Sequence, residues 1–495
     1  MQKQRFVILG GGTAGWMAAN LIAKQWGERV AVQVIESPDI GIIGVGEGST
    51  PSLKRFFEIL EIPESAWMPR CQATYKVSIR FEGWSPDSGR ASYSHPFISQ
   101  PDTFTERAFH VNCRTRRLGL DVNTNPEDFL LNGVLAKQGK AAITPPNFPF
   151  RMEYGYHFNS GLLGEFLAEH AKKLGVSRIQ TRIVEVEQFA NQDIAALLDE
   201  HGVRYEGDFF IDCTGFAAKL IEETLKVGFD SFASNLFNDS AVVLPSPAAD
   251  APPVETLSKA LSCGWMWRIP LTERFGNGYV YSSRYTSADQ AEQELRRELG
   301  MENDPTEARH LTMRVGQRQR HWAHNCLALG LSQGFIEPLE ATALHLVQVA
   351  ILEFIHCYEE GDFGPSRRDQ YNGFVRERFE RVRDYIVAHY KLNTRRDSQY
   401  WLDNRNNDQL SPTLDKLLMA WFKRQDMAAE IQRLGIGDHF NVTSWHCLLA
   451  GYGAFPPLDP NQPGRGDLYQ EQGIAQFLDG CSLNFPSQRD ALARF

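Results

Sequence analysis

The first residues that could do chemistry are three glycines and a carboxylate near the N-terminus. Gly10, Gly12 and Gly15 fit the spacing G-x-G-x-x-G, and Glu36 follows 21 positions after Gly15. The first glycine permits a tight turn, the second admits a pyrophosphate and the third lets a helix pack on a strand. A carboxylate in that place can accept hydrogen bonds from a ribose diol. These four residues therefore predict a bound dinucleotide rather than a bare glycine turn.

The elements that must position this loop can be recognised from apolar patterns. An apolar strand over residues 6–9 precedes the glycines, a helical pattern from Met17 to Trp26 follows, and a second apolar strand over 30–35 leads into Glu36. Unbroken apolar strands are typical of a parallel sheet that is buried on both faces. Further strands of the same α/β fold are predicted at 208–212 and 326–329.

The last third of the chain has a different pattern. Apolar residues recur at helical spacing over 379–390 and again over 414–421, where Ser411 and Pro412 form a helix start signal. Residues 453–466 are rich in Pro and Gly, which indicates a loop. We therefore expect one module over residues 1–375 and a mostly helical module over 376–495.

Composition narrows the classes of function. A net charge of −10 argues against a nucleic-acid partner, and no apolar run approaches the ~20 residues that span a bilayer, so we expect a cytoplasmic protein. The eight cysteines stand singly, without C-x-x-C or zinc-ligand spacing, so reduced thiols are expected. His321 and His324 have no partner at metal-site spacing, so the sequence predicts no metal site.

Only one dinucleotide fingerprint is present, which predicts a single bound dinucleotide and no second site for a nicotinamide reductant. If that dinucleotide is FAD, its electrons must come from another protein, as reduced flavin from a separate reductase. A tightly bound NAD(P)H remains the alternative.

A second conspicuous stretch is GWMWRIP, residues 264–270. Strand alternation would place Trp265 and Trp267 on one face and Met266 and Arg268 on the other. Paired aromatic residues on a strand face usually pack in a core, and this is the favoured interpretation of the stretch taken alone.

Five stretches in order along residues 1 to about 400 together resemble the flavin-dependent tryptophan halogenase family. They are GGGTAGW at 10–16, GVGEG at 44–48, YKV at 75–77 before FEGW at 81–84, W-x-W-x-I-P at 265–270, and FIEPLE at 335–340. The resemblance implies a Rossmann-like FAD-binding fold of the flavin monooxygenase type with an added, mostly helical substrate module. It also implies that reduced FAD, oxygen and chloride or bromide generate hypohalous acid, which halogenates an aromatic ring.

The resemblance assigns roles to two residues. Lys76 matches the lysine next to the aromatic substrate, where a buried ammonium could hydrogen-bond hypohalous acid or become a haloamine. Glu340 matches the second catalytic residue, which polarises the hypohalous acid or takes the ring proton. Without the resemblance, Lys76 reads as a surface lysine on a strand and Glu340 as an acidic residue at a helix start.

The residues after Glu340 are expected to hold the halide. Thr342 and Ala343 would open a helix over 344–358, where their backbone N–H groups could bind an anion. The family often reads Glu-Ser-Thr-Gly where this chain has Glu-Ala-Thr-Ala. Ala341 keeps the amide but lacks the serine hydroxyl, which puts the efficiency of the Lys76 and Glu340 pair in question.

The substrate side is matched by aromatic residues. His95 and Phe97 correspond to residues that sandwich the indole ring, and Phe440 is the expected opposing aromatic; each could equally be core. The tryptophan-specific members carry a Tyr-Tyr-Glu segment that holds the amino and carboxylate groups, and the stretch 429–438 lacks it. We therefore predict an open site for indole-like, electron-rich aromatics rather than free tryptophan.

The remaining expected roles also follow from the resemblance. The strand with Trp265, Trp267, Ile269 and Pro270 would lie beside the flavin and an internal tunnel and keep organic substrate off the oxidant. The expected FAD-binding residues are Gly10, Gly12, Thr13, Ala14, Gly15, Glu36, Gly48 and Leu331. A homodimer is possible on the same ground. The alternatives are a flavin monooxygenase that hydroxylates an aromatic, or a catalytically silent flavoprotein or binding module.

Overall fold

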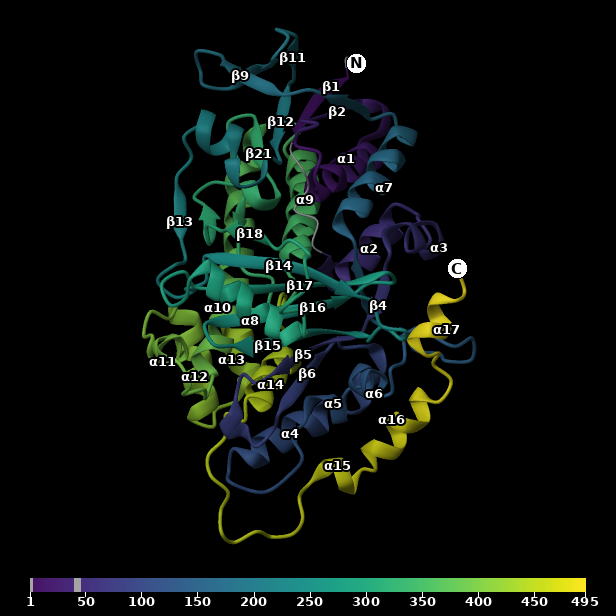
Figure 1. Ribbon diagram of the computed structural model, residues 1–495, viewed down its shortest axis with the longest axis vertical. Coiled ribbons are helices and arrows are strands. Elements are labelled where there is room, and N and C mark those ends of the chain that lie inside the picture. Colours follow the sequence, from purple (N-terminus) through teal and green to yellow (C-terminus); the bar gives the residue numbers. More distant parts are fainter. Residues whose placement is uncertain (1–2, 40–45) are drawn as a thin grey trace. The chain divides into compact units, whose positions relative to one another are not determined.

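The computed structural model describes residues 3–39 and 46–495, which divide into two compact units (Figure 1). Unit 1 contains the described residues within 1–73, together with 158–233 and 313–380, and unit 2 contains 74–157, 234–312 and 381–495. The chain therefore passes between the units several times, and the helical C-terminal residues group with the strands of unit 2. The long helix α10 (Arg368–Leu392) crosses the expected module boundary at 375.

Unit 1 is built on a six-stranded sheet in the order β20-β21-β12-β1-β2-β8. All neighbours pair in parallel except β20 and β21. The strands are β1 (Gln4–Leu9), β2 (Val30–Glu36), β8 (Ser177–Gln180), β12 (Phe209–Asp212), β20 (Trp322–Ala323) and β21 (Cys326–Ala328). The four apolar runs predicted as strands thus lie side by side, as expected for a doubly covered α/β sheet.

Helices lie beside this sheet, as Figure 1 shows for α1, α7 and α9. The helices of unit 1 are α1 (Thr13–Trp26), α2 (Ser52–Ile59), α3 (Glu64–Trp67), α7 (Ser160–Lys173) and α9 (Ala343–Glu360), with the first part of α10. Phe6 on β1 is fully buried and packs on Trp26 of α1 and Phe354 of α9, with ring centroids 5.2 and 6.5 Å away. These aromatic contacts join both helices to the sheet and add apolar burial that stabilises unit 1.

Small strands complete unit 1. An antiparallel meander contains β9 (Ile183–Gln188), β10 (Ile194–Asp199) and β11 (Arg204–Glu206). A second three-stranded sheet contains β13 (Phe229–Ser231), β19 (Gly316–Arg318) and β22 (Gly334–Phe335). The short strand β3 (Glu47–Gly48) follows the residues that the structure does not describe.

Unit 2 is built on a seven-stranded sheet in the order β18-β14-β17-β16-β15-β5-β6. Its strands are β5 (Ser78–Glu82), β6 (Ser92–Pro96), β14 (Ser240–Pro247), β15 (Glu255–Leu261), β16 (Gly264–Pro270), β17 (Arg274–Tyr281) and β18 (Arg309–Thr312). All neighbours are antiparallel except β15 and β5. The stretch GWMWRIP is strand β16, near the middle of this sheet.

Beside this sheet, β4 (Thr74–Lys76) pairs antiparallel with β7 (Gly155–Phe158). The helices of unit 2 are α4 (Glu106–Arg116), α5 (Pro126–Phe129), α6 (Leu131–Lys137), α8 (Ala288–Leu299), α11 (Gln399–Asn406), α12 (Pro412–Phe422), α13 (Met427–Leu434), α14 (Val442–Gly451), α15 (Leu468–Glu471), α16 (Ile474–Ser482) and α17 (Gln488–Leu492), with the rest of α10. As predicted, Ser411 caps α12, since its hydroxyl accepts the N–H of Leu414 at 3.0 Å.

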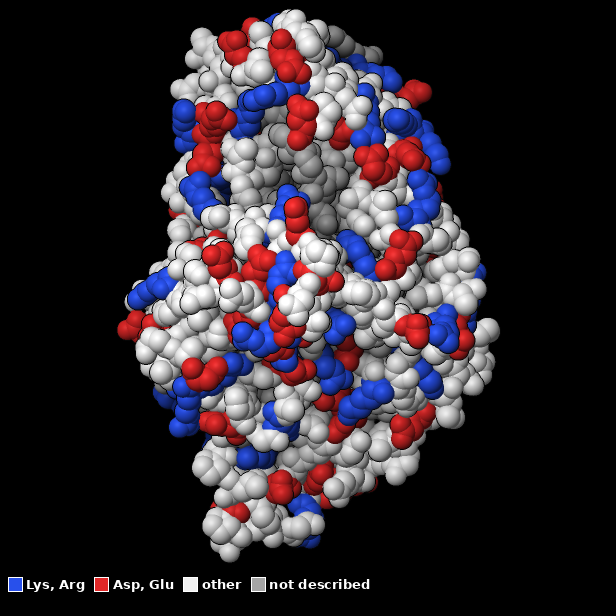
Figure 2. All heavy atoms as spheres, in the orientation of Figure 1, with Lys and Arg blue, Asp and Glu red and all other residues white. Residues whose placement is uncertain are grey.

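Among the described residues, no helix is long and apolar enough to cross a membrane. Basic and acidic side chains are interspersed over the face drawn in Figure 2, without a large field of one sign. All eight cysteines are free thiols.

Candidate active site

The glycine-rich loop of unit 1 has space where a pyrophosphate would approach. Gly10 has φ +113°, and a Cβ there would lie 2.2 Å from the carbonyl oxygen of Cys213. A Cβ at Gly15 would lie 2.1 Å from the carbonyl oxygen of Gly10, so both positions require glycine. A Cβ at Gly12 would meet nothing within 4 Å. The loop is therefore tight against the fold at its two ends and open at its middle glycine.

Helix α1 begins directly after this open position. Gly12 is its N-cap and makes no side-chain cap hydrogen bond. The N–H groups of the first turn and the positive end of the helix dipole favour an anion at this end. Loop and helix start thus form a cradle that fits a phosphate group, with Thr13 and Ala14 as the first helical residues.

Glu36 lies at the same loop, at the end of β2. A Cβ at Gly11 would come within 1.5 Å of Glu36 Oε2, so the missing side chain of Gly11 leaves room for the carboxylate. Arg178 on β8 donates from Nε to Glu36 Oε1 and also pairs with Glu165 at 3.0 Å. Its guanidinium lies 5.5 Å from the ring centroid of Trp16. Arg178 therefore orients the carboxylate that would meet the ribose, and no short-range signal in the sequence pointed to it.

A buried carboxylate arranges the turns on the other side of the loop. Asp212, at the end of β12, accepts the N–H groups of Leu220 and Ile221 at 2.8 Å each and the hydroxyl of Ser332 at 3.0 Å. Ser332 ends the short turn that holds Leu331, and a Cβ at Gly330 would lie 2.9 Å from Cβ of Ala14. Leu331 is thus held in a turn next to the glycine-rich loop.

Of the GVGEG stretch, Gly44 and Val45 lie outside the described residues, while Gly48 is in β3. Burial raises the pKa of the neighbouring Glu47 to about 6, and the hydroxyl of Ser160 partly opposes this. The open glycine, the uncapped helix and Glu36 together fit a dinucleotide such as FAD.

The segment predicted to hold a halide leads into α9 of unit 1. Glu340 and Thr342 are buried, and Ala343 is the first residue of the helix and is exposed. Ala341 has φ +55°, a left-handed conformation that is strained for a residue with a side chain, and its N–H donates to the carbonyl of Pro338 at 2.9 Å. The backbone is thus held in an unusual turn directly between Glu340 and Thr342.

Lys76 is the last residue of β4 in unit 2 and is fully buried. Its ammonium lies 5.4 Å from the ring centroid of Phe97, a cation–π distance. The side-chain amide of Asn132 donates to the carbonyls of Phe97 at 2.6 Å and of Glu153 at 2.7 Å, which fixes the chain at Phe97. The surface interpretation of Lys76 is therefore wrong, because the side chain is fully buried. A buried lysine must be held by its surroundings.

His95 and Phe440 both contact a residue that the sequence did not single out. The ring of Tyr385 on α10 stacks on Phe440 with centroids 3.6 Å apart and planes 5° apart, and on His95 at 6.0 Å and 29°. The Tyr385 hydroxyl donates to the carbonyl of Ser444 at 2.9 Å. Because Tyr385 covers one face of Phe440, a bound aromatic ring could stack only on the other. The helical period over 379–390 could have drawn attention to this tyrosine.

Trp265 and Trp267 pack against each other as strand alternation predicts, with ring centroids 6.0 Å apart and planes inclined by 57°. Both are buried, and Met266 is buried on the opposite face. Trp267 pairs with Gly278 on β17. Within the part of the chain that the structure describes, the indole Nε1 of Trp267 has no acceptor, which is unusual for a buried donor.

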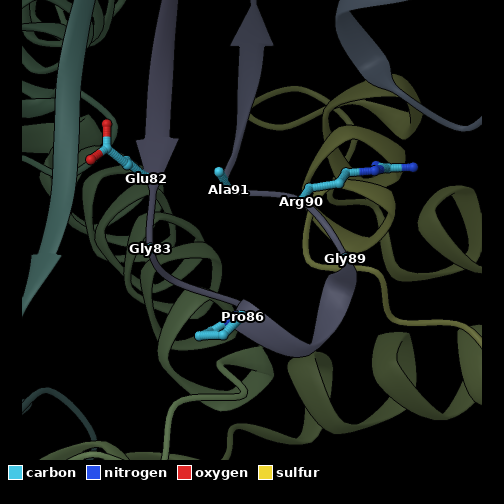
Figure 3. A pocket seen from close by; sticks show the side chains of 6 residues that line it. All are labelled: Glu82, Gly83, Pro86, Gly89, Arg90 and Ala91. Carbon is cyan, nitrogen blue, oxygen red and sulfur yellow. The ribbon is translucent and has the colours of Figure 1, made fainter.

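A surface hollow of about 470 Å³ lies at the hairpin of β5 and β6 (Figure 3). It is lined by Glu82, Gly83, Pro86, Gly89, Arg90 and Ala91, none of them a predicted site residue. Glu82 and Arg90 point away from each other in Figure 3; Glu82 pairs with Lys259 at 3.4 Å, and Arg90 donates to the carbonyl of Ala450 at 3.1 Å. Among the described residues no group of His, Cys, Asp and Glu side chains is arranged to hold a metal ion.

The predicted residues thus fall into local groups. In unit 1 the glycine-rich loop meets Glu36 and the Leu331 turn, and Glu340, Thr342 and Ala343 follow one another at the start of α9. In unit 2 Lys76 meets Phe97, His95 and Phe440 share Tyr385, and Trp265 meets Trp267. Arg178, Asp212 and Tyr385 are the residues that the sequence left unassigned.

Comparison with known proteins gives a consistent result. The family model described as tryptophan halogenase matches residues 5–462. Tryptophan 6-halogenase SttH of Streptomyces toxytricini is 37% identical over 427 residues, which are 81% of this chain and 80% of that protein. Tryptophan 7-halogenase RebH of Lentzea aerocolonigenes is 30% identical over 493 residues, which are 91% of this chain and 90% of that protein.

Solved structures agree. A flavin-dependent halogenase from Xanthomonas campestris superposes with a TM-score of 0.87 at 36% identity, covering 100% of this chain and 99% of that one. BrvH, a flavin-dependent halogenase from Brevundimonas sp. BAL3, has a TM-score of 0.83 at 32% identity, covering 100% and 99%.

Proposed function

Since the chain belongs to the tryptophan halogenase family, we propose that it is an FADH2-dependent halogenase in which Lys76 delivers the halogen to an electron-rich aromatic ring. Bound reduced FAD would supply, with oxygen and chloride or bromide, the hypohalous acid. The observation that carries the role of Lys76 is its complete burial with the ammonium at the face of Phe97. A surface lysine could not keep so reactive an oxidant away from water and other side chains.

The residues of unit 1 fit the cofactor half of this reaction. The open position at Gly12 and the uncapped start of α1 would bind the pyrophosphate, and Glu36, oriented by Arg178, would accept the ribose hydroxyls. Thr342 and Ala343 would offer backbone N–H groups to the halide at the start of α9, and Glu340 would polarise the hypohalous acid or take the ring proton. Ala341, with φ +55°, makes the backbone turn between Glu340 and Thr342.

The residues of unit 2 fit the substrate half. His95, Phe97 and the face of Phe440 opposite Tyr385 would stack on a flat ring, and the buried Trp265 and Trp267 would fill space so that organic substrate stays off the oxidant. We propose an indole-like substrate rather than free tryptophan, because 429–438, which lacks the Tyr-Tyr-Glu segment, forms most of the short helix α13 and the turn after it. A charged amino acid end would then lack polar partners.

Two partners complete the proposal. The single dinucleotide fingerprint supports a separate flavin reductase as the source of FADH2, by diffusion or transient contact. A homodimer is the oligomeric state that we propose.

The test supplies the protein with FAD, a flavin reductase, NADH, oxygen and bromide or chloride, and with a panel of indoles, phenols and tryptophan. Halogen isotope pairs in the mass spectra of the products are the expected result, with indoles preferred over tryptophan. Lys76→Ala should abolish halogenated product and leave FAD binding unchanged. Lys259→Ala is the matched control, since that lysine lies on β15 of the same unit and pairs with Glu298 at the surface.

Three outcomes would contradict the proposal or a part of it. Oxygenated products in place of halogenated ones, with and without halide, would indicate a flavin monooxygenase. Halogenation that persists in Lys76→Ala would remove Lys76 from the mechanism, and clean, efficient turnover of tryptophan would overturn the substrate preference.

A further inference from the structure

A buried histidine in unit 2 connects the strand of Lys76 to three other strands. His157 on β7 is fully buried. Its Nδ1 lies 3.0 Å from the hydroxyl of Thr74 on β4, and its Nε2 lies 2.9 Å from the hydroxyl of Thr256 on β15. Thr74 in turn bonds to the carbonyl oxygen of Pro270, the last residue of β16, at 2.8 Å. One imidazole therefore joins β7, β4, β15 and the end of the W-x-W-x-I-P strand.

In the neutral state of the imidazole, the donor and the acceptor of each hydrogen bond in this network can be assigned. A carbonyl oxygen can only accept, so the single hydroxyl hydrogen of Thr74 goes to Pro270. Thr74 Oγ1 must then accept from His157, which places a hydrogen on Nδ1. In the neutral imidazole Nε2 accepts the hydroxyl hydrogen of Thr256. Burial and the nearby charge of Lys76 hold the pKa of His157 well below its usual range.

The strand register places this histidine next to Lys76. Thr74 pairs with His157, and Lys76 pairs with Gly155, so all four positions are on one face of the two-stranded ladder. Gly155 has no side chain, and His157 is therefore the cross-strand side chain that β7 places beside Lys76 on that face. A protonated imidazole there would add a second buried cation beside the ammonium.

We propose that His157, held as the neutral Nδ1–H tautomer between Thr74 and Thr256, is a positioning residue that fixes β4, and with it the Lys76 ammonium, against the end of β16. The inference rests on the proposed role of Lys76. Thr74 is two residues from Lys76 on the same face, so a shift at Thr74 moves the ammonium. A displacement of about 1 Å can reduce a rate on the order of a hundredfold.

The test removes one hydroxyl at the end of the network that is far from Lys76 in sequence. In Thr256→Val the hydrogen bond to Nε2 is lost and the side-chain shape is nearly kept, whereas Thr256→Ser keeps the hydroxyl. For Thr256→Val we expect kcat for aromatic halogenation to fall on the order of tenfold or more, at unchanged FAD affinity and unchanged flavin oxidation. Hypohalous acid that no longer reaches the substrate should appear in solution, where a halogen-accepting dye traps it. Thr256→Ser should restore the wild-type ratio of halogenated product to trapped hypohalous acid.

Two controls separate positioning from loss of stability. Thr105→Val removes another buried hydroxyl of unit 2, one that donates to the carbonyl of Phe129 at 2.5 Å, and should leave the product ratio unchanged. If Thr256→Val does not fold, Thr256→Ala removes the same hydroxyl with less bulk. An unchanged product ratio in a folded hydroxyl-deleted variant, or a fall in Thr105→Val as large as in Thr256→Val, would overturn the positioning role.

A separate measurement does not depend on halogenation. Nitrogen-15 spectra of histidine-labelled protein should contain one neutral Nδ1–H imidazole that disappears in His157→Asn. An Nε2–H or doubly protonated His157 would overturn the inference even in an active enzyme. A wild-type protein that halogenates no aromatic would instead overturn the proposed function of Lys76, and with it the positioning role, while the observed tautomer would still describe the network.

Discussion

The indole of Trp267 lies so close to Gly278 that one added methyl group tests the packing of the W-x-W-x-I-P strand. A Cβ at position 278 would lie 2.1 Å from Cζ2 and 2.3 Å from Cη2 of Trp267. Carbon atoms in favourable contact are about 3.5–4.0 Å apart, so Gly278→Ala forces an overlap of more than about 1 Å. The neighbouring Trp265 is also buried, and the indole has little room to move away.

Overpacking of this kind costs about 1–3 kcal/mol. For a chain of this length that unfolds as a whole, each kcal/mol lowers Tm by about 1 °C, since the unfolding entropy is about 2.1 cal/mol/K per residue. Gly278→Ala should therefore lower Tm by about 1–3 °C. Gly373→Ala is the matched control, because a Cβ there meets nothing within 4 Å and the position lies in α10; it should stabilise the protein by about 0.5–1 kcal/mol.

Thermal unfolding of the two alanine variants beside the wild type checks the prediction, and the halogenation assay extends it. If the indole keeps organic substrate off the oxidant, its displacement should also change the balance between halogenated product and free hypohalous acid. Equal Tm values for Gly278→Ala and Gly373→Ala would refute the packing argument. A lowered Tm with an unaltered product balance would leave the tryptophan pair as plain packing.

Two further predictions concern the cofactor and pH. Gly12→Ala should leave Tm of the FAD-free protein unchanged and weaken FAD binding in a fluorescence titration, because its Cβ enters the open side of the loop. Gly10→Ala should instead destabilise the FAD-free protein. An FAD affinity of Gly12→Ala equal to that of the wild type would place the pyrophosphate elsewhere. Burial lowers the pKa of His110 to about 4 and that of His446 to about 3, from an ordinary value of 6.5. The native state keeps both histidines neutral, while the unfolded chain takes up protons below pH ~6.5. The contribution of the two neutral histidines to the unfolding free energy is therefore fully present above that pH. It falls toward pH 4 by up to about 1.4 kcal/mol per pH unit for each histidine. Urea unfolding across this range should show a weaker dependence of the unfolding free energy on pH in His446→Phe than in the wild type. An unchanged pH dependence would exclude His446 as a cause.

The nucleotide half of the fold could be predicted because its signals are local. Residues 6–15 contain the strand, the glycines and the helix start in one run, and Glu36 ends the next strand. Parallel pairing then follows from the apolar pattern alone. Ser411 is a similar case, because a helix cap depends on residues three positions apart.

The residues that orient those groups could not be predicted, because their partners are distant in the chain. Arg178 reaches Glu36 across 142 positions, and Ser332 reaches Asp212 across 120. A sequence pattern of period 2 or 3.6 carries no information about such pairs. The grouping of residues 381–495 with 74–157 and 234–312 likewise depends on contacts between distant segments, which no local pattern predicts.

Lys76 shows why the sequence motif and the contacts of the fold must be considered together. A lysine on a short strand is usually a surface residue, and only the resemblance to a family favoured a buried one. In the fold, several contacts hold this strand and its surroundings. His157 bonds to Thr74 of the strand, the side-chain amide of Gln488 donates to the carbonyl of Tyr75 at 2.9 Å, and Asn132 donates to the carbonyl of the neighbouring Phe97. These contacts come from segments up to 413 positions away. The motif thus supplies the reactive group, and the rest of unit 2 supplies the rigid strand that keeps an otherwise flexible ammonium in one place.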